Sequence, residues 1–296
     1  MKTKRSLLIF LLFGFLLTGV EAQTKKGAPE SALLYRITGK KLTKPSYIFG
    51  TIHLICPKDM FPADELKGYI NQTEQLLLEI DLDDPTVTQK AAKGATLPAG
   101  KTVKDYLKPE EYEKIDEMFE NYLGISYDQL QTYKPSLLAG ILLRSPKIIG
   151  CPGPVAYDSF LAETATAGKL PINGLETVEA ELSAIDSQSL EKQVAVLNKL
   201  ADDPEKGFSN FKDLYRVYLT QSSDDLYNLA AKSSDMDASQ QKKLLAERNV
   251  AWIPVIEKNI KATPSFIGVG GAHLGGPKGV LKLLRERGYI LTPIKL

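Results

Sequence analysis

The sequence predicts an α/β protein whose central mixed sheet is built from both ends of the chain around a largely helical middle. Short β-rich runs, such as "LLYRITG", "SYIFGTI" and "SFIGVGG", lie near the two ends of the chain. Between them, from about residue 105 to 262, Leu, Ala, Gln and Lys recur at helical spacing with few strand-like runs. We therefore expect one α/β domain over residues 23–296, with a helical insertion or cap over about 105–262.

The first third of the chain predicts three strands. Residues 32–38 and 46–51 are β-rich and are separated by "GKKLTKP", which indicates a hairpin or two adjacent strands. The run "QLLLEIDL", residues 75–82, is short and mostly apolar, as is typical of a strand buried on both faces. Residues 64–74 before it suit a crossover helix. Residues 83–103 contain two prolines and two glycines and predict a loop or broken structure.

The middle of the chain is predicted to be mainly helical. Pro109 and the acidic residues after it open a helix in "KPEEYEKIDEMFENYL". Helical spacing continues through "SYDQLQTYKPSLLAGILLR", interrupted at Pro135, and residues 155–167 also suit a helix. A short strand in "KLPINGLET" ends near Glu176, and three further helical tracts are expected over about 178–261.

The C-terminal segment returns to strand-like sequence. "SFIGVGG" predicts a strand, "PKGVLKLLRERGY" a helix opened by Pro277 and closed by Gly288, and "YILTPIK" a last strand. These elements would join the sheet that the N-terminal strands begin.

The N-terminus has the pattern of a secretory signal peptide. Lys2, Lys4 and Arg5 precede an apolar run over residues 7–20, and "VEA" resembles a small-x-small cleavage site. The run is shorter than the roughly 20 residues that span a bilayer, although an uncleaved anchor is an alternative. We expect cleavage after residue 22, export to the periplasm or outside the cell, and no stable membrane span afterwards.

The charge balance excludes some partners. The chain has 37 basic and 36 acidic residues, a net charge of +1, which creates no long-range field to attract nucleic acid or anionic lipid. No nucleic-acid partner is therefore expected.

The two cysteines, Cys56 and Cys151, predict a disulfide. An exported protein meets an oxidising compartment, and an even cysteine count favours pairing. Thiolate ligation of a metal near His53 is the alternative, although neither cysteine has a Cys-x-x-Cys partner.

Two histidines occur in the chain, and both stand in the same local pattern. His53 ends Gly-Thr-Ile-His and His273 ends Gly-Ala-His after a further glycine, each just beyond a predicted strand. Ligands of open α/β sheets bind at the C-terminal ends of the strands, and glycine permits the sharp turn that aims a side chain there. We expect both imidazoles to converge on one crevice.

Carboxylates follow the other two strands of this predicted edge. Glu79 and Asp81 lie near the end of "LLLEIDL", and Glu176 follows "NGL". Two histidines and a carboxylate form a ligand set of zinc hydrolases that leaves one position open for water. The sequence does not distinguish Zn from Mn or Co. Alternatively, Asp81 belongs to a solvated turn and Glu176 stabilises the start of the next helix.

Arg248 lies within the apolar stripe of the predicted helix "QQKKLLAERNVAWIPVIEKNI". A charge on an apolar face either extends to solvent or pairs with an interior carboxylate, here Glu79 or Glu176. Pro254 is expected to kink this helix.

The glycine-rich "GVGGAHLGG" matches neither a phosphate loop nor a dinucleotide fingerprint.

Several of these motifs occur in the same order in one known family. The segments "YIFGTIHL", "LLLEIDL", "INGLETVEAEL", "AERN" and "FIGVGGAHLGGPKGVLKLLRERGYIL" resemble the TraB/GumN family, which includes the animal TIKI proteins. The resemblance implies an α/β core of the erythromycin-esterase/ChaN-like kind and, in the TIKI branch, a metal-dependent protease that acts on secreted signalling proteins. TIKI proteins are membrane-attached, and because no such anchor is expected here the substrate stays open.

The motifs and the resemblance together predict an exported hydrolase that uses a divalent metal ion to cleave peptide or protein substrates. His53, His273 and Glu79 would bind the metal; Glu79, Glu176, Arg248 and Asn249 would be the catalytic residues, with Glu79 binding metal or acting as base. Two alternatives stay open: a non-catalytic protein that sequesters peptides, and an esterase that uses the same site for a small molecule.

Overall fold

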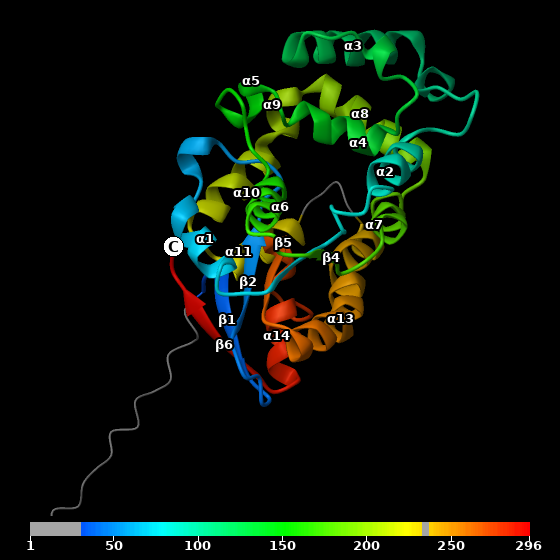
Figure 1. The fold of residues 1–296 in the computed structure, drawn as a ribbon. Helices are drawn as coiled ribbons and strands as arrows, with labels where there is room; N and C mark the ends of the chain where they lie inside the picture. Colours follow the sequence, from blue (N-terminus) through cyan, green and yellow to red (C-terminus); the bar gives the residue numbers. More distant parts are fainter. Residues whose placement is uncertain (1–30, 233–236) are drawn as a thin grey trace, which may run out of the picture. The chain divides into compact units, whose positions relative to one another are not determined.

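A mixed sheet lies at the centre of the part of the chain that the computed structural model describes, residues 31–232 and 237–296 (Figure 1). Its six strands stand in the order β4-β3-β5-β2-β1-β6. Their bounds are β1 Leu34–Gly39, β2 Ser46–Thr51, β3 Gln75–Leu78, β4 Ile172–Gly174, β5 Ser265–Gly270 and β6 Tyr289–Ile294. The sheet thus combines strands from both ends of the described chain, as the sequence predicts.

Four neighbouring strands of the sheet run in the same direction. β5 pairs in parallel with both β2 and β3, and β3 pairs in parallel with β4. β1 is antiparallel to β2 and to β6. The C-terminal ends of β2, β3, β4 and β5 therefore meet at one edge, which is where ligands bind in open α/β sheets.

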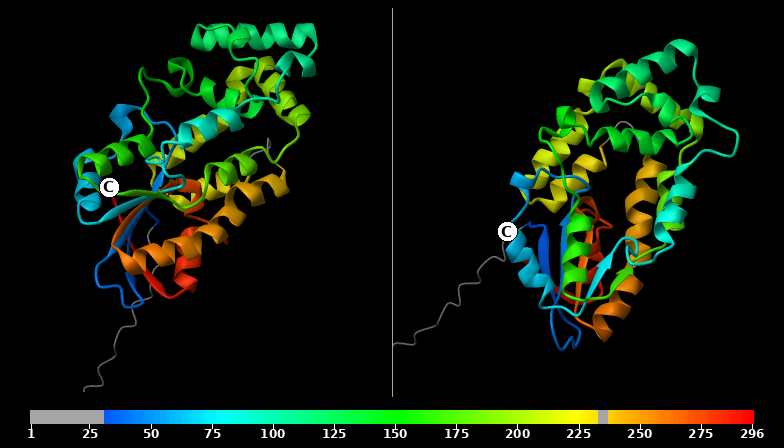
Figure 2. Two further views of the ribbon diagram at one scale, coloured as in Figure 1. Left: turned by 45° about the vertical axis from the view of Figure 1, so that its right-hand side comes forward. Right: turned by 45° about the horizontal axis from the view of Figure 1, so that its top comes forward.

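Helices cover both faces of this sheet. α1 (Ala63–Ile70) and α6 (Tyr157–Ala167) lie against one face, while α13 (Arg248–Ala262) and α14 (Val280–Glu286) cover the other (Figure 2). The apolar side chains of these helices and of the strands form one buried cluster. Because both faces are covered, every residue of β2 is buried and its sequence lacks the apolar–polar alternation of a half-exposed strand.

The helical middle has a hydrophobic cluster of its own. This cluster is formed mainly by α3 (Pro109–Leu123), α4 (Pro135–Leu142), α5 (Pro146–Ile149) and α8 (Leu190–Asp202), with Tyr127 and Phe208 beside them. The observation agrees with a largely helical region between the strands. The exact bounds of the insertion, about 105–262, stay a prediction.

The remaining helical elements complete the described part of the chain. They are η1 Pro57–Asp59, α2 Val87–Ala95, η2 Val103–Tyr106, η3 Tyr127–Gln129, α7 Val178–Ile185, α9 Pro204–Gly207, α10 Ser209–Leu219, α11 Ser223–Ala230, α12 Ala238–Gln241, η4 Lys242–Glu247 and η5 Gly271–His273. η4 is a π-helix that continues directly into α13.

Several predicted bounds differ from the structure. β3 ends at Leu78, four residues earlier than predicted, so Glu79 follows the strand and Asp81 lies in the next turn. The segment 83–103, predicted to be irregular, contains α2, which packs against α7. This tertiary contact stabilises a helix that the prolines and glycines around it obscured. The region 178–261 is divided into more helices than the three that were predicted.

Cys56 and Cys151 form the predicted disulfide, with their Cα atoms 5.9 Å apart. The bond joins the segment after β2 to the segment before α6. Beside it, Ile55 and Val155 form a β-bridge, and the backbone N–H of Cys56 donates to the hydroxyl of Tyr215 over 2.9 Å. His53, three residues before Cys56, is therefore carried on a tethered segment. Thiolate ligation of a metal by these cysteines is excluded in this oxidised state.

The predicted signal peptide, residues 1–22, lies outside the described residues. No helix within 31–232 or 237–296 combines the length and the apolar character needed to cross a bilayer.

Candidate functional site

The parallel edge of the sheet gathers most of the residues that the sequence singled out. His53 lies two residues after β2, Glu79 directly after β3, Glu176 two residues after β4, and His273 in η5 directly after β5. Residues separated by up to about 220 positions are thus placed on neighbouring strand ends, because the pairing of β2 with β5 and of β3 with β4 brings those ends together.

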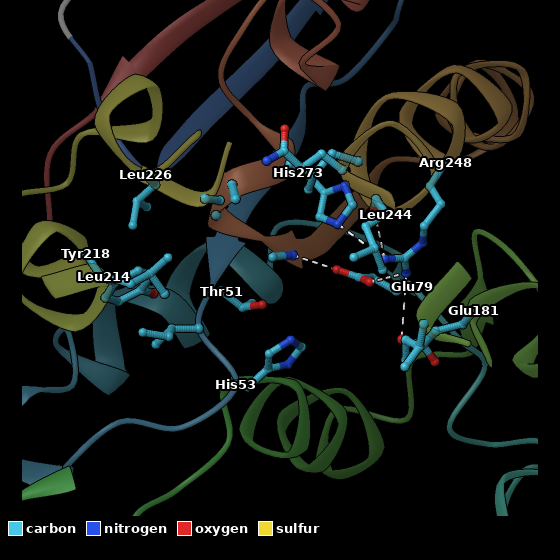
Figure 3. Close-up of a pocket in the computed structure, with 18 residues that line it drawn as sticks. Thr51, His53, Glu79, Glu181, Leu214, Tyr218, Leu226, Leu244, Arg248 and His273 are labelled. Atoms are coloured by element: carbon cyan, nitrogen blue, oxygen red, sulfur yellow. Dashed lines mark hydrogen bonds and ion pairs between the residues drawn. The ribbon is translucent and has the colours of Figure 1, made fainter. Parts of the chain in front are cut away.

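A cavity of about 290 Å³ lies at this edge. His53, Glu79, Arg248 and His273 all line it, and the two histidines face it from different sides (Figure 3). Glu176 and Asn249 do not line this cavity; they contact side chains that do. Glu176 and Asn249 can therefore influence the cavity only through the lining side chains that they contact.

Arg248 connects three glutamates at one end of the cavity. Its Nη2 donates to Glu79 Oε2 over 2.6 Å, and its Nε donates to Glu176 Oε1 over 2.7 Å. Glu181 Oε1 lies 3.7 Å from the same Nη2. The predicted pairing of Arg248 with an interior carboxylate is confirmed, and it includes both glutamates considered. One positive charge facing three carboxylates leaves this end of the cavity negative.

His273 is held in one orientation by Asn249. The side-chain amide of Asn249 donates to the carbonyl oxygens of His273 and Lys278, over 3.2 and 2.9 Å. Its oxygen must therefore accept from His273 Nδ1, which lies 2.6 Å away. In the neutral ring the lone pair is then on Nε2, 3.4 Å from Arg248 Nη1. Burial lowers the pKa of His273 to about 4, so this ring is neutral at pH 7.

Glu79 is ionised despite its burial. Burial alone raises its pKa, but His273, Arg248 and the backbone N–H of Gly270 outweigh this effect and lower the pKa to about 2. The Gly270 N–H donates to Glu79 Oε1 over 2.7 Å, while Arg248 holds the other oxygen. Both oxygens of Glu79 are thus engaged, which makes this carboxylate a weak base and suits it to binding a cation.

Glu181 is a site residue that the sequence analysis missed. It lines the cavity from α7, and no hydrogen bond between described residues reaches its oxygens. Burial and the charge of Glu79 raise its pKa to about 7, against the opposing effect of Arg248. Glu79 and Glu181 are therefore two carboxyl groups of one cavity with very different proton affinities.

Asp158 is a second missed residue, at the start of α6. Thr51, the last residue of β2, donates its hydroxyl to Asp158 Oδ1 over 3.3 Å. Burial raises the pKa of Asp158 to about 6; the charge of nearby His53 opposes this shift and that of Glu79 adds to it. His53 itself is exposed to solvent. Asp158 thus lies within electrostatic range of both residues.

The glycines of the second Gly-x-x-His unit allow close packing at this edge. A Cβ on Gly271 would lie 2.9 Å from Leu226 Cδ1 and 3.3 Å from the carbonyl oxygen of Thr51. A Cβ on Gly270 would lie 3.4 Å from both Glu79 Oε1 and His273 Cδ2. A side chain at Gly271 would therefore push η5, and His273 with it, away from α11 and β2.

The predicted metal ligands border the same cavity without forming a ligand shell. Among the described residues, no three or more His, Cys, Asp or Glu side chains are grouped as a metal site. Arg248 provides the positive charge nearest to Glu79 and to Nε2 of His273. The structure therefore brings the proposed ligands to one cavity, with a guanidinium between two of them.

Comparison with known families agrees with this arrangement of motifs. The profile of the TraB/PrgY/gumN family matches residues 33–293, which include the whole sheet except the last residue of β6. The chain belongs to the TraB/PrgY/gumN family.

Two relatives of this TraB/PrgY/gumN chain are named as proteases. Metalloprotease TIKI1 of Danio rerio is 22% identical over 92% of this chain and 65% of its own length. Metalloprotease TIKI2 of Xenopus tropicalis is 21% identical over 83% of this chain and 57% of its own length. The chain thus spans less than two thirds of the length of either relative. No solved structure matches it significantly.

Three acidic residues, Asp81, Glu181 and Asp158, show what the sequence pattern of this family member could not resolve. Asp81 accepts a hydrogen bond from the N–H of Asp83 in an exposed turn, as the alternative interpretation had it. Glu181 and Asp158 lie in the first turns of α7 and α6, where an acidic residue commonly just stabilises a helix start. From the sequence alone, an acidic residue that stabilises a helix start cannot be distinguished from one that lies beside a cavity.

Proposed function

We propose that this chain is a hydrolase that uses a divalent metal ion to cleave peptide bonds, with His53, Glu79 and His273 as the metal ligands. The observation that carries the proposal is the meeting of both Gly-x-x-His histidines and an ionised glutamate at one cavity on the C-terminal edge of the sheet. The TIKI relatives support proteolysis as the reaction, although they share only 21–22% identity with the chain.

Two properties of these side chains support the binding of a divalent cation. His273 is neutral and has its Nδ1 fixed by an amide oxygen, which is the usual second-sphere support of a metal-binding imidazole. Glu79 is ionised, and the three glutamates around Arg248 leave an excess of two negative charges when all are ionised (3 − 1). A divalent cation would balance that excess.

A metal ion held by these residues would polarise a substrate carbonyl and lower the pKa of a bound water. The residues of the chain supply the remaining functions. Asn249 fixes the tautomer and the orientation of His273. Glu176 and Glu79 hold the guanidinium of Arg248 at the cavity, where its positive charge can stabilise negative charge that develops on a substrate oxygen.

Export is part of the proposal. A disulfide joins the two cysteines of the sequence, and disulfides persist in oxidising compartments such as the periplasm or the extracellular space. An N-terminal sequence of the purified mature protein that begins at residue 23 would support signal-peptide cleavage, whereas one that begins at Met1 would contradict it.

The test of function combines metal analysis with hydrolysis of a peptide library. We expect the purified protein to retain a divalent metal and to cleave peptides until a chelator is added. H53A and H273A should each lose metal content and should lose about 100-fold or more in kcat/KM, because a ligand is missing. E179Q, an exposed substitution on α7, serves as the control and should keep both properties.

Each other outcome identifies a different function. Full metal content in H53A or H273A would refute the ligand assignment. Tight binding of peptides without cleavage would indicate a sequestering protein, and chelator-sensitive cleavage of esters but not of peptides would indicate an esterase.

A further inference from the structure

The cavity has one charged end and one apolar wall. Glu79, Glu181 and Arg248 lie at the charged end. Opposite them, Leu214 and Tyr218 of α10 and Leu226 of α11 form a wall without charge (Figure 3). Ile52 and Ala230 extend this surface, and we call these five residues the apolar wall. Its two helices follow each other in the chain and pack together, so the wall has a defined shape.

The polar atom in this wall is already satisfied. The hydroxyl of Tyr218 donates to the carbonyl oxygen of Gly50 over 3.0 Å, so only the ring of Tyr218 is left for the cavity. The other four members are aliphatic. A polar or charged ligand group placed against this wall would lose hydrogen bonds to water and gain none in return.

The volume of the cavity sets the size of group that fits. A cavity of about 150 Å³ lined by apolar side chains holds a benzene molecule. The cavity here, about 290 Å³, is larger and also has to admit the reacting bond at its charged end. It therefore suits a leucine, methionine or phenylalanine side chain next to that bond, whereas an alanine side chain would leave much of the wall uncovered.

We propose, on the basis of the hydrolase function inferred above, that this cavity selects peptides with a large apolar side chain at the residue next to the scissile bond. The apolar wall holds that side chain, and the scissile bond lies toward Glu79, His273 and His53. An acidic side chain at the same position is rejected, since it would meet an apolar surface on one side and the carboxyl groups of Glu79 and Glu181 on the other.

The experiment uses the full-length mature protein loaded with divalent metal and a set of peptides that differ at one position. That position carries Leu, Met, Phe, Ala, Asp or Lys, and kcat/KM is measured for each peptide. We expect Leu, Met and Phe to exceed Ala by about tenfold or more, which is the usual effect of several methylene groups in an apolar pocket. Asp should be the poorest substrate.

A variant that narrows the cavity tests the wall itself. A230L adds three carbon atoms to the wall and should lower the ratio of kcat/KM for the Leu peptide to that for the Ala peptide by about fivefold or more. V250A, an exposed position of α13 outside the cavity, should leave this ratio unchanged. Near-UV circular dichroism confirms that both variants are folded.

A binding measurement tests the proposed selectivity even if no peptide is cleaved. Trp252, the single tryptophan, packs against His273 with ring centroids 4.5 Å apart, so its fluorescence reports events at the cavity. N-acetyl-leucinamide should change this fluorescence at a lower concentration than N-acetyl-alaninamide, and A230L should reduce the difference. Cleavage or binding that does not depend on the side chain would overturn the proposed selectivity. Selective binding without any cleavage would keep it and refute the hydrolase function instead.

Discussion

At the residue scale, the electrostatics of the site depend on Arg248. Its guanidinium is largely buried, with 10% of the side chain exposed, and it pairs with Glu79 and Glu176, which are 14% and 10% exposed. It also lies over the ring of Trp252, with Cζ 4.8 Å from the ring centroid. Arg248 therefore compensates carboxylates that would otherwise be buried without a partner.

Removing this charge should destabilise the fold. R248Q leaves Glu79 and Glu176 without their cation, and breaking a buried pair from one side typically costs about 3–5 kcal/mol. We expect a lower free energy of unfolding by about 2–4 kcal/mol in urea denaturation of the metal-free protein at neutral pH, after allowance for partial exposure. R216Q, which removes an arginine with 75% exposure, should change it by less than about 0.5 kcal/mol. An equally small effect of R248Q would show that the ion pairs contribute little.

Glu181 should make the stability of the metal-free protein depend on pH. Its pKa is raised from 4.5 to about 7, so the folded state binds this proton more tightly than the unfolded state. This group therefore lowers the stability progressively as the pH rises from about 4.5 to about 7, with no further loss above that. E181Q lacks the carboxyl group that binds this proton, so its stability does not fall for this reason as the pH rises.

We expect E181Q to unfold like the wild type near pH 4.5 and to be more stable by about 1–3 kcal/mol near pH 8. Urea denaturation across this range measures the difference. E179Q, whose carboxyl group is exposed on the same helix, should show no such trend. A difference between E181Q and the wild type that does not change with pH would contradict the assignment.

At the scale of elements, the position of His273 depends on how η5 packs. η5 follows β5 without a connecting loop and contacts α11 and β2. α13 reaches the same place from the other side through Asn249 and Arg248, directly after the π-helix η4. π-Helical turns are frequent at functional sites because they redirect side chains. Here the transition from η4 to α13 falls at Arg248.

A methyl group at Gly271 should disturb this packing. In G271A the new Cβ would lie 2.9 Å from Leu226 and 3.3 Å from Thr51, and overpacking of this kind costs about 1–3 kcal/mol. G68A is the matched control, because Gly68 lies in α1 with no atom within 4 Å of the added carbon. There the same change should stabilise the protein by about 0.5–1 kcal/mol. The midpoint temperature of thermal unfolding, measured for both variants, should fall for G271A and rise for G68A. A higher midpoint for G271A would contradict the close packing described at Gly271.

At the scale of the whole molecule, the disulfide links regions that lie 95 residues apart in the chain. It connects the segment that carries His53 to the end of the helical stretch before α6. Tyr215 of α10 adds a second tether: its hydroxyl accepts from the N–H of Cys56 and donates to Asp59 over 2.8 Å. The first histidine thus depends on a long-range covalent bond for its support.

Removing the disulfide should destabilise the protein without abolishing the fold. C56S/C151S should lower the free energy of unfolding by about 2–5 kcal/mol, because the unfolded chain regains the freedom of a long loop. Urea denaturation of this variant, and of the wild type with and without reductant, gives the comparison. The reduced wild type should match the variant; if reduction leaves the wild type unchanged, the bond contributes nothing to stability.

The fold was predictable from the sequence because its signals are local. β-Rich runs such as 46–51 and 265–270 and the glycines near their C-terminal ends identify strands and turns without any knowledge of the partner strand. The same reasoning failed for α2, whose helix depends on packing against α7, and it placed the end of β3 too late. Both errors concern residues whose conformation is decided by neighbours that are distant in sequence.

For the site, the sequence by itself determined which side chains follow the parallel strands: His53, Glu79, Glu176 and His273. It could do so because each of these polar residues follows its strand within three positions in the chain. Only the tertiary structure decided that Glu181 lines the cavity and that the charges of Asp158 and His53 interact. It also decided that Arg248 joins two glutamates at once and that Asn249 orients the imidazole of His273. Charge pairing and burial depend on distances in space, and helices far apart in sequence set those distances when they pack on the sheet.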